Sequence, residues 1–420
     1  MGLIRCGLDF GTSNSTLAVI GSGRARLIAL EDGQSTLPSA VFLDGEGAPP
    51  LFGRAAIAAY VSGEEGRLMR GLKSTLGSAL AEEKTRVGNR MLSFQDIIGQ
   101  FFGHMKAHLM AQTGAGPDAF ALVLGRPVHF VDGDVAADVA AQEVLAKIAR
   151  TQGFDQIAFQ YEPIAAALQY EQGITREELV LIVDIGGGTS DFSIVRVSPD
   201  RANKADRQDD ILANDGIRVG GTDFDRLLSL AAVMPQLGFG SEKQSAKGPM
   251  PRHYYTDLAT WHRINQLYSD KALADLRALR RLAMRPDLLD RMIRVVEKRH
   301  GHSLAMASEA AKIMLTEADE AILRIAPFTK GPNVRVRRAG FERVVAAPVE
   351  RIRGLLADVL RQAGLRAEDI GTVFMTGGSS SLPVLRASVQ AILPGVPIAT
   401  GDHLGSVGTG LALDARRKFG

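Results

Sequence analysis

The sequence predicts an α/β protein made of two duplicated lobes, and two observations support that prediction. Residues 6–20 and 180–197 share one pattern: a short apolar strand, an aspartate, a glycine turn, small hydroxyl residues and a second apolar strand. A match between distant parts of a chain indicates a duplicated unit. The chain of 420 residues, 45% of them hydrophobic, is also long enough to form two domains that each have a core.

The first strand of each unit ends in an aspartate, and the two aspartates set the alignment. Asp9 in CGLDFGTSNSTLAVI matches Asp184 in VLIVDIGGGTSDFSIVRV when one extra glycine is allowed in the second turn. The same alignment matches three further pairs: Thr12 with Thr189, Ser13 with Ser190, and Asn14 with Asp191. Each unit is therefore expected to begin with a β-hairpin whose turn has the same function.

The composition of these turns indicates phosphate binding. Glycine has no Cβ and accepts a positive φ, so a glycine-rich turn points several N–H groups inward and lets a phosphate approach closely. The hydroxyls of Thr12, Ser13 and Thr189 add donors. Asp9 and Asp184 would repel a bare phosphate unless a divalent cation lay between them, and Mg²⁺ prefers such oxygen ligands. The hairpins thus predict a magnesium-nucleotide site; the alternative is two ordinary tight hairpins with polar turns.

Charge and cysteine content narrow the classes of function. The chain has 49 basic and 47 acidic residues, for a net charge of +2, so no strong overall field would draw it to nucleic acid or to a membrane. Cys6 is the one cysteine of the sequence, which excludes an internal disulfide framework. We recognise no signal peptide and no apolar run that could span a bilayer, and we therefore expect a cytoplasmic protein.

Six motifs follow one another in the order and spacing of a known family. They are GLDFGTSNS (7–15), EPIAAALQYE (162–171), VDIGGGTSDFSIV (183–195), GIRVGGTDFD (216–225), MTGGSSSLPVLR (375–386) and GDHLGSVGTGLAL (401–413). Together they resemble the nucleotide-binding domain of the seventy-kilodalton heat-shock chaperones, the DnaK family, over nearly the whole chain. The resemblance implies an α/β fold of two duplicated ribonuclease-H-like lobes, as in actin-like ATPases, around a nucleotide cleft.

The resemblance also implies ATP or ADP with Mg²⁺ as ligands, and it assigns site residues motif by motif. The phosphate turns would comprise Gly11, Thr12, Ser13 and Asn14 in the first hairpin and Gly186, Gly187, Gly188 and Thr189 in the second, with Gly220 and Gly221 near the phosphates and ribose. The nucleoside would be contacted by Glu309, Lys312, Thr316, Gly377, Gly378, Ser379 and Asp402. Asp9 and Asp184 would hold the magnesium, largely through water.

Further residues match the family positions that act on the attacking water. Lys73, in GLKSTLG, resembles the lysine that orients the water and the γ-phosphate, while Glu162 and Asp191 resemble its acidic partners. Thr189 belongs to the same catalytic group. Taken alone, a lysine is more often a solvated residue on a helix face. Glu162 also suits the first turn of a helix that begins next to Pro163, and both roles can hold together.

Two departures from the family pattern concern the adenine. The chaperones place an arginine on each side of the base, whereas this chain has Ile313 and Ser381 at those positions. Losing one stacking guanidinium removes about 0.5–2 kcal/mol, so losing both weakens nucleotide binding by about tenfold to a thousandfold. We expect weaker ATP binding than in full-length chaperones and looser discrimination among purines.

A third departure concerns communication with a peptide-binding domain. Family members relay the nucleotide state through a proline followed by an arginine. Pro127 is present here, but Val135 stands where the arginine belongs. We expect no linker or β-rich domain after the helix that ends in DARRKFG at Gly420. We therefore expect the chain to be most similar to the short YegD-like relatives, which consist of the ATPase portion alone.

The motifs divide the chain into expected parts, which are lobe I (1–170) with an outer subdomain (36–109) that carries Lys73, lobe II (171–402) with an insertion (223–336), and a last helix (403–420) that returns to lobe I. Within the insertion, residues 275–299 have the pattern of an amphipathic helical region broken at Pro286. Closure of the lobes around the nucleotide would be a hinge motion that gates turnover.

Three other groups of residues give weaker indications. His104 and His108 are four residues apart, as in some zinc sites, but no third ligand is evident. His300 and His302 lie in a basic stretch that could bind nucleic acid, although Lys and Arg at helical spacing usually mark a solvated face. Trp261 lies in an aromatic cluster, for which core packing is favoured over a partner-binding surface.

These expectations favour a slow, Mg-dependent ATPase that acts as a chaperone-like protein. Its expected partners are an adenine nucleotide and protein clients or co-chaperones, with no nucleic acid and no membrane. An actin-like filament-forming ATPase is the structural alternative, which ATP-dependent sedimentation would distinguish. A small-molecule kinase is a further alternative, although no acid is placed as a sugar-hydroxyl base; a screen for phosphorylated products during ATP turnover would test it.

Overall fold

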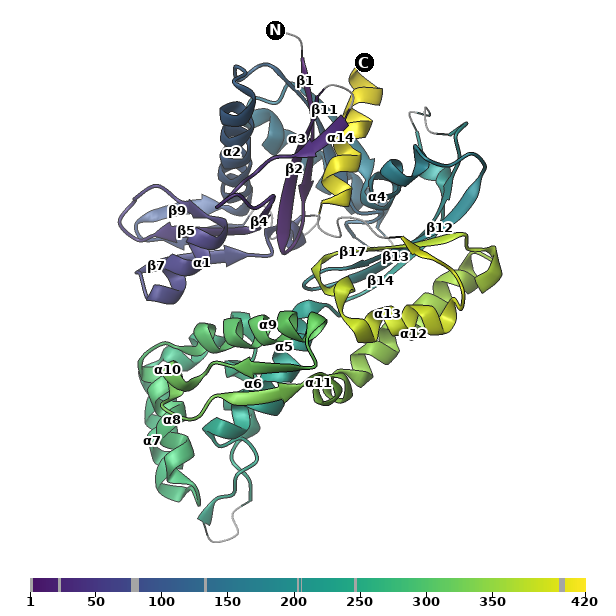
Figure 1. Ribbon diagram of the computed structural model, residues 1–420. Helices are drawn as coiled ribbons and strands as arrows, with labels where there is room; N and C mark the ends of the chain where they lie inside the picture. The colour runs from purple at the N-terminus through teal and green to yellow at the C-terminus, as the bar shows by residue number, and fades with distance from the viewer. Residues whose placement is uncertain are drawn as a thin grey trace. The chain divides into compact units, whose positions relative to one another are not determined.

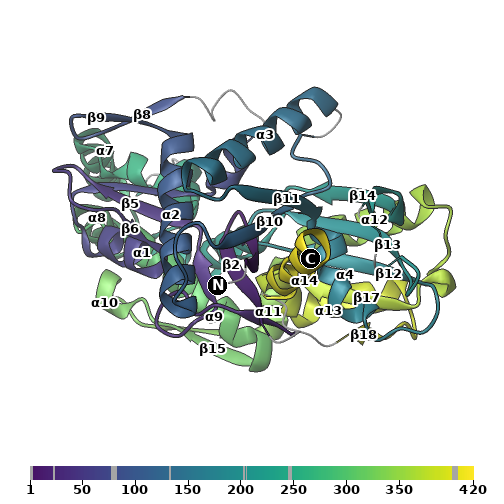
Figure 2. The ribbon, with the colours of Figure 1, turned by 90° about the horizontal axis from the view of Figure 1, so that it is seen from above.

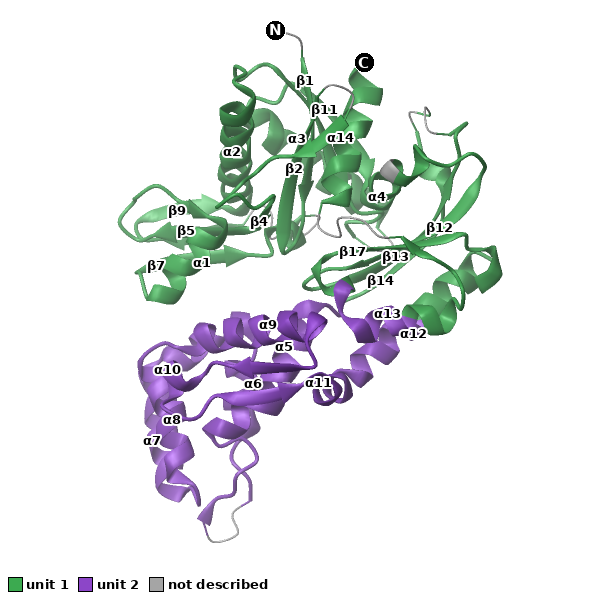
Figure 3. Cartoon of the chain, viewed as in Figure 1, with its two compact units in different colours: residues 1–218, 355–380, 389–420 green, residues 219–354, 381–388 purple. Residues whose placement is uncertain are grey.

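A computed structural model describes residues 3–21, 24–76, 83–131, 134–201, 204, 206–244, 248–399 and 405–420. Contacts between residues divide the chain into two units (Figure 3). Unit 1 comprises Met1–Arg218, Leu355–Ser380 and Val389–Gly420, and unit 2 comprises Val219–Gly354 and Ser381–Ser388. The predicted lobe boundary between residues 170 and 171 lies inside unit 1 and stays a prediction.

The first sheet of unit 1 is built around the N-terminal hairpin. Its strands are β1 (Ile4–Phe10), β2 (Asn14–Gly21), β3 (Arg24–Leu27), β10 (Phe120–Arg126) and β11 (Gln156–Tyr161), in the order β11-β10-β1-β2-β3, and β4 (Thr36–Pro38) also pairs with β2. Strands β1, β10 and β11 are parallel to one another, whereas β2 and β3 continue the sheet in antiparallel fashion. Strand β10 is buried at all seven of its residues, as expected for a central strand of a parallel arrangement.

The second sheet of unit 1 repeats this arrangement. Its strands are β12 (Glu178–Ile185), β13 (Ser190–Val197), β14 (Ile211–Ile217), β17 (Thr372–Thr376) and β18 (Ile398–Ala399), in the order β14-β13-β12-β17-β18. Here too the first hairpin continues into parallel strands on one side and an antiparallel strand on the other. The duplication predicted from the two hairpins is therefore confirmed by the strand order, and the α/β fold class with it.

Two helices lie between the sheets and share a core with both. They are α4 (Glu162–Glu171) and α14 (Ser406–Phe419), and Figure 2 shows them side by side. Their core contains Val123 of the first sheet, Val180 of the second, Ile164 of α4 and Leu411 of α14. The two helices approach backbone to backbone, because a Cβ at Gly410 would lie 1.8 Å from the carbonyl oxygen of Ala165.

The remaining elements of the first 155 residues cover the first sheet and extend from it (Figure 1). They are α1 (Gly53–Ser62), α2 (Phe94–Thr113), α3 (Val135–Thr151), a short 3-10 helix η1 (Leu72–Thr75), and the strands β5 (Ala40–Asp44), β6 (Leu51–Phe52), β7 (Gly66–Arg70), β8 (Lys84–Val87) and β9 (Arg90–Ser93). Helix α2 packs through Phe101 and Phe102 against Phe10 at the end of β1, with ring centroids 5.7 and 5.3 Å apart. This aromatic contact anchors the strand that carries Asp9.

Unit 2 is mostly helical. It contains α5 (Gly221–Leu228), a π-helical segment (Ser229–Val233), α6 (Arg252–Leu258), a 3-10 segment (Trp261–Tyr268), α7 (Asp270–Leu282), α8 (Pro286–Glu297), α9 (Gly301–Glu317), α10 (Ala326–Thr329), α11 (Arg338–Val344) and the hairpin β15–β16 (Glu320–Leu323, Val334–Arg337). The break predicted at Pro286 is confirmed, since this proline begins α8. Helices α12 (Ala346–Gln362) and α13 (Pro383–Ile392) each contain a unit boundary.

The aromatic cluster of unit 2 is a packing feature. Trp261 lies edge to face with His302, with 4.7 Å between the ring centroids, and His302 is buried. The hydroxyl of Tyr268 accepts a hydrogen bond from the backbone N–H of Gly301 at 3.0 Å. Core packing, the favoured interpretation of Trp261, agrees with these contacts, and His302 is not on the surface of the basic stretch.

Among the described residues, no helix combines the length and the apolar character that crossing a bilayer requires.

The contact between α4 and α14 leads to a stability prediction. Gly410→Ala places a methyl group against the Ala165 carbonyl, so we expect the free energy of unfolding to fall by about 1–3 kcal/mol. Urea denaturation followed by circular dichroism measures this change. Gly354→Ala is the matched control, because it lies on α12 with no atom within 4 Å of its would-be Cβ. That control should be neutral or stabilising, by up to about 1 kcal/mol, and equal losses in both variants would contradict the packing account.

Candidate functional site

The first predicted phosphate turn connects β1 to β2 and contains Gly11, Thr12 and Ser13. A side chain cannot be accommodated at Gly11, since its Cβ would lie 2.1 Å from the carbonyl oxygen of Asn14. Ser39, which follows β4, forms two hydrogen bonds to the backbone of this turn. Its hydroxyl donates to the Gly11 carbonyl at 2.6 Å and its backbone N–H donates to the Ser13 carbonyl at 2.9 Å. These bonds occupy turn carbonyls, so the turn can direct N–H groups toward a ligand.

The second predicted phosphate turn connects β12 to β13 and contains Gly186, Gly187, Gly188 and Thr189. The backbone N–H of Gly186 donates to the Thr189 carbonyl at 3.0 Å, which closes the turn. The hydroxyl of Ser379 donates to the Gly186 carbonyl at 3.2 Å. Ser379 is thus placed next to this turn, as the resemblance implied for a neighbour of the nucleotide, although its role toward the base stays a prediction.

Asp9 and Asp184 occupy matching places at the ends of β1 and β12. Burial, followed by the negative charge of Glu162, raises the pKa of Asp9 to about 7. Burial, followed by the charges of Asp191, Glu162 and Asp9, raises the pKa of Asp184 to about 8. The four carboxylates are therefore near enough to disfavour one another's ionised forms. A cation at this place would relieve that repulsion.

The residues present fit a magnesium ion bound mainly through water. No group of three or more His, Cys, Asp or Glu side chains that could hold a metal occurs within the described part of the chain. Mg²⁺ commonly takes one or two carboxylates and completes its octahedron with waters and substrate phosphates. Asp9 and Asp184 would supply that pair of carboxylates. Gly377 also crowds Asp184, because a Cβ at Gly377 would lie 2.4 Å from its Oδ1.

Lys73 lies in the 3-10 helix η1 and extends into the same cluster. Its Nζ donates to Oε1 of Glu162 at 2.5 Å, and both side chains are largely buried. Burial alone would lower the pKa of Lys73, but the charges of Glu162 and Asp9 outweigh that effect and raise it. Lys73 is therefore a buried ammonium among carboxylates. The alternative of a solvated lysine on a helix face is wrong.

Glu162 is the first residue of α4, next to Pro163. An acidic residue in the first turn favourably offsets the helix dipole, so the helix-start interpretation of Glu162 also holds. Asp191 lies opposite Asp184 in the β12–β13 pairing and contributes to its raised pKa. The structure thus brings Lys73, Glu162, Asp191, Asp9 and Asp184 together within unit 1, and what each does to a ligand stays a prediction.

The predicted residues of unit 2 form a separate set. Gly220 precedes α5 and Gly221 begins it. Glu309, Lys312 and Thr316 share one face of α9 at intervals of three and four residues. Lys312 is buried, and its Nζ contacts Asp225 of α5 at 2.9 Å and the Gly221 carbonyl at 3.3 Å. The resemblance gave no indication of Asp225 as this partner.

Ile313 and Ser381, the two positions predicted to lie beside the adenine, are both among the described residues. Ile313 lies on α9 and is 59% exposed to solvent. Its neighbour Met314 is 50% exposed. Ser381 ends the short 3-10 segment Gly378–Ser381, which also contains the predicted residues Gly378 and Ser379. Asp402 lies outside the described residues.

The histidine pair of α2 is explained by aromatic packing. The ring of His104 stacks on Phe52 with 4.3 Å between centroids and meets His108 edge to face at 4.7 Å. Burial, followed by the charge of His108, lowers the pKa of His104 to about 4. His104 is therefore a neutral ring in an apolar contact at ordinary pH.

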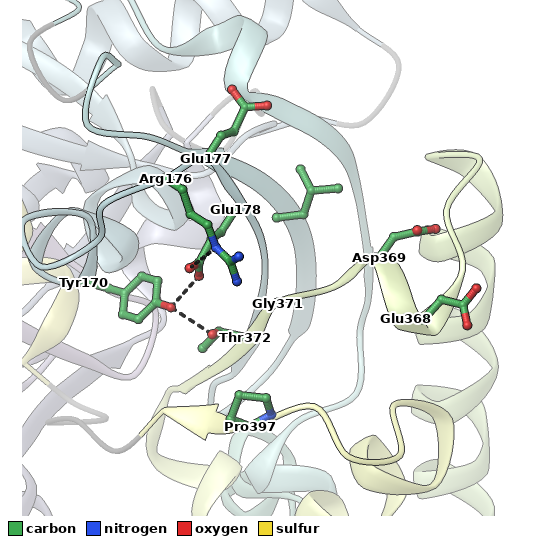
Figure 4. A pocket seen from close by; sticks show the side chains of 10 residues that line it. Tyr170, Arg176, Glu177, Glu178, Glu368, Asp369, Gly371, Thr372 and Pro397 are labelled. Carbon is green, nitrogen blue, oxygen red and sulfur yellow. Dashed lines mark hydrogen bonds and ion pairs between the residues drawn. The ribbon is translucent and has the colours of Figure 1, made fainter.

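A pocket of about 560 Å³ lies at the opposite ends of the β12 and β17 strands from the phosphate turns (Figure 4). The hydroxyl of Tyr170 donates to Glu178 at 2.6 Å and lies 3.0 Å from the Thr372 hydroxyl. Glu178 also faces Arg176, at 3.8 Å, so its charge has a basic neighbour. None of the predicted site residues that the structure describes lines this pocket.

Comparison with known proteins agrees with this geometry. A family model described as Hsp70 protein matches residues 5–100, 83–234 and 292–416. The chain belongs to the Hsp70 family. The Hsp70 match includes both phosphate turns, Lys73, Glu162 and the α9 face.

Several curated Hsp70-family relatives are similar over almost the whole chain. The chaperone protein HscA of Serratia proteamaculans is 26% identical over 425 residues, and that of Citrobacter koseri is 26% identical over 423 residues. HscA of Escherichia coli O17:K52:H18 is 25% identical over 423 residues. Each alignment covers 98% of this chain and 58% of the relative. The chain therefore spans somewhat more than half of the length of these Hsp70 proteins.

The carboxylate cluster leads to a prediction about pH. The pKa values of Asp9 and Asp184 lie above the ordinary value of 3.8, so between about pH 4 and pH 8 the folded protein binds more protons than the unfolded chain. Stability then falls as pH rises through this range. We expect the Tm of the nucleotide-free, Mg-free protein to decrease between pH 5 and pH 8.5 more steeply than that of Asp184→Asn. Equal slopes in calorimetry would contradict the raised pKa of Asp184.

Proposed function

We propose that this Hsp70-family chain binds Mg-ATP at its two glycine turns and hydrolyses it slowly. The observation that carries the proposal is the Lys73–Glu162 ion pair, which lies among Asp9, Asp184 and Asp191 and belongs to the same unit as both turns. A buried ammonium inside a ring of carboxylates is costly to assemble for stability alone. It suits a site where a highly charged ligand and its cation complete the charge balance.

The turns would bind and orient the polyphosphate. Their backbone N–H groups and the hydroxyls of Thr12 and Ser13 would donate to phosphate oxygens, and the Gly11 carbonyl is already held by Ser39. Asp9 and Asp184 would hold Mg²⁺ through water, and the ion when bound would neutralise phosphate charge. No side chain need form a covalent bond, since positioning and charge stabilisation supply most of phosphoryl-transfer catalysis.

Lys73, Glu162, Asp191 and Thr189 would act on the water and the γ-phosphate. Lys73 keeps its proton because its pKa is raised, so it can donate to the water or to a phosphate oxygen. Glu162 fixes the Lys73 ammonium at 2.5 Å and, with Asp191, would accept the hydrogen bond that aligns the water. Such alignment is the requirement for in-line attack.

The proposal includes the nucleoside and the cellular role. The α9 face with Glu309, Lys312 and Thr316 would contact the ribose and the base, and Gly377 to Ser379 and Asp402 would line the other side. By its similarity to HscA, the chain would act as a cytoplasmic, chaperone-like protein whose nucleotide state is recognised by clients or co-chaperones. A pull-down with ATP-bound and ADP-bound protein tests that role, and identical partner sets in both states would contradict it.

Removing the Lys73 ammonium should separate binding from hydrolysis. We expect Lys73→Ala to retain ATP binding within a few-fold while kcat falls by about 10²–10³, as measured by calorimetry and by phosphate release. Lys84→Ala, an exposed lysine of β8, is the control and should leave both quantities unchanged. Equal turnover by Lys73→Ala and the parent protein would remove Lys73 from the mechanism.

The base position should respond to a restored guanidinium. We expect Ile313→Arg to strengthen ATP binding by about two- to thirtyfold, which corresponds to about 0.5–2 kcal/mol of cation–π stacking. It should also widen the difference between ATP and GTP. Met314→Arg adds the same charge one residue further along α9 and should give a smaller gain. Equal gains from both variants would indicate a general charge effect rather than stacking on the base.

A further inference from the structure

Gly125 and Arg126, the last two residues of β10, lie next to Glu162 and the residue before it. Gly125 pairs with Gln160 and Arg126 pairs with Tyr161 in the parallel β10–β11 ladder, directly before Glu162 begins α4. A Cβ at Gly125 would lie 3.1 Å from Cδ1 of Leu411, 3.3 Å from Cγ of Glu162 and 3.5 Å from its Oε1. The absence of a Cβ at Gly125 therefore leaves room for the Glu162 side chain, whose Cγ packs here beside Leu411 of α14.

Arg126 forms hydrogen bonds with the backbone of the two residues that follow it and contacts α3. Its guanidinium donates to the carbonyls of Pro127 at 3.1 Å and Val128 at 3.3 Å, and to the Gln142 amide oxygen at 2.5 Å. It also forms an ion pair with Asp138 of α3. The Arg126 side chain is only 10% exposed. An arginine with so many fixed acceptors is rigid, since its planar group is held at both ends.

The same guanidinium holds the residue before Glu162. It lies 5.0 Å from the centroid of the Tyr161 ring and 5.4 Å from that of Phe130. Tyr161 is the N-cap of α4, and its backbone N–H donates to the Gln160 side chain at 2.9 Å. A guanidinium at this distance from an aromatic ring is attracted to it by a cation–π interaction. The start of α4, and with it the origin of the Glu162 side chain, is thus fixed from the β10 side.

We propose that Gly125 and Arg126 are positioning residues for Glu162, and through it for Lys73. Gly125 leaves room for the Glu162 side chain at its Cγ, and Arg126 fixes the backbone from which that side chain extends. This inference rests on the proposed hydrolysis of ATP. Misplacing a reacting group by about 1 Å can cost a factor of about 10² in rate. Small displacements of Glu162 should therefore be measurable in kcat.

Gly125→Ala tests the volume. The added methyl should push Glu162 away from Lys73, and kcat should fall at least tenfold while the Kd for ADP changes less than twofold. The exposed Gly116→Ala, with no atom within 4 Å of its would-be Cβ, is the matched control and should leave both values unchanged. A parent-like kcat in Gly125→Ala, or a loss of ADP binding equal to the loss of kcat, would overturn the proposal.

Arg126 is tested by a double-mutant cycle with Glu162. We expect Arg126→Gln to lower kcat about ten- to a hundredfold, Arg126→Lys to restore part of it, and Arg126→Gln to cause little further loss in a Glu162→Gln background. Arg150→Gln, an exposed arginine of α3, is the control. Equal losses in both backgrounds would show that Arg126 acts on stability alone and would overturn its positioning role.

Hydrogen exchange provides a readout that needs no turnover. In nucleotide-free protein, Arg126→Gln should accelerate amide exchange in the peptide that covers β11 and the start of α4, while exchange in the second sheet stays as in the parent. If the parent protein hydrolyses no ATP, the proposed function fails, but this measurement still decides whether Arg126 fixes Tyr161 and Glu162. Unchanged exchange at β11 and α4 would count against the inference even in an active enzyme.

Discussion

The concentration of charge around Lys73 is the constraint on which the rest of the site depends. Burial, followed by the repulsion among Asp9, Glu162, Asp184 and Asp191, raises the pKa values of Asp9 and Asp184, and the Lys73 ammonium offsets part of that effect. Such an arrangement persists only if rigid elements hold each group in place. Two duplicated sheets, a 3-10 helix and the first turn of α4 meet that requirement.

The duplication explains how the charges come together. Each sheet has the same strand order, so its central strand ends in an aspartate beside a glycine turn. Helices α4 and α14 lie between the sheets and share apolar contacts with both. Glu162 begins one of these helices, which places a carboxylate where the two hairpins contribute theirs. Asp9 and Asp184 thus occupy equivalent positions in the two duplicated sheets. Glu162, at the start of α4, has no such equivalent among the residues of this cluster.

Local pattern predicted much of this site, and long-range contacts account for what it missed. The repeat of strand, aspartate and glycine turn identified both hairpins, because the conformation of a turn depends mainly on its own few residues. Motif resemblance found Lys73, whose burial no periodicity indicates. Ser39 and Asp225 were missed because their partners are far away in the sequence, as in the Ser39 bonds to the first turn. The division through α12 and α13 was missed for the same reason, since it follows contacts rather than chain order.

The close approach of Gly410 to Ala165 has a mechanical consequence. Where helices meet through side chains, rotamer changes can absorb small displacements, but a backbone-to-backbone contact offers no such compliance. We therefore expect a relative movement of the two sheets to turn about this contact rather than to slide across it. The contact of α4 with α14 would then act as a pivot, and Glu162 is the first residue of α4.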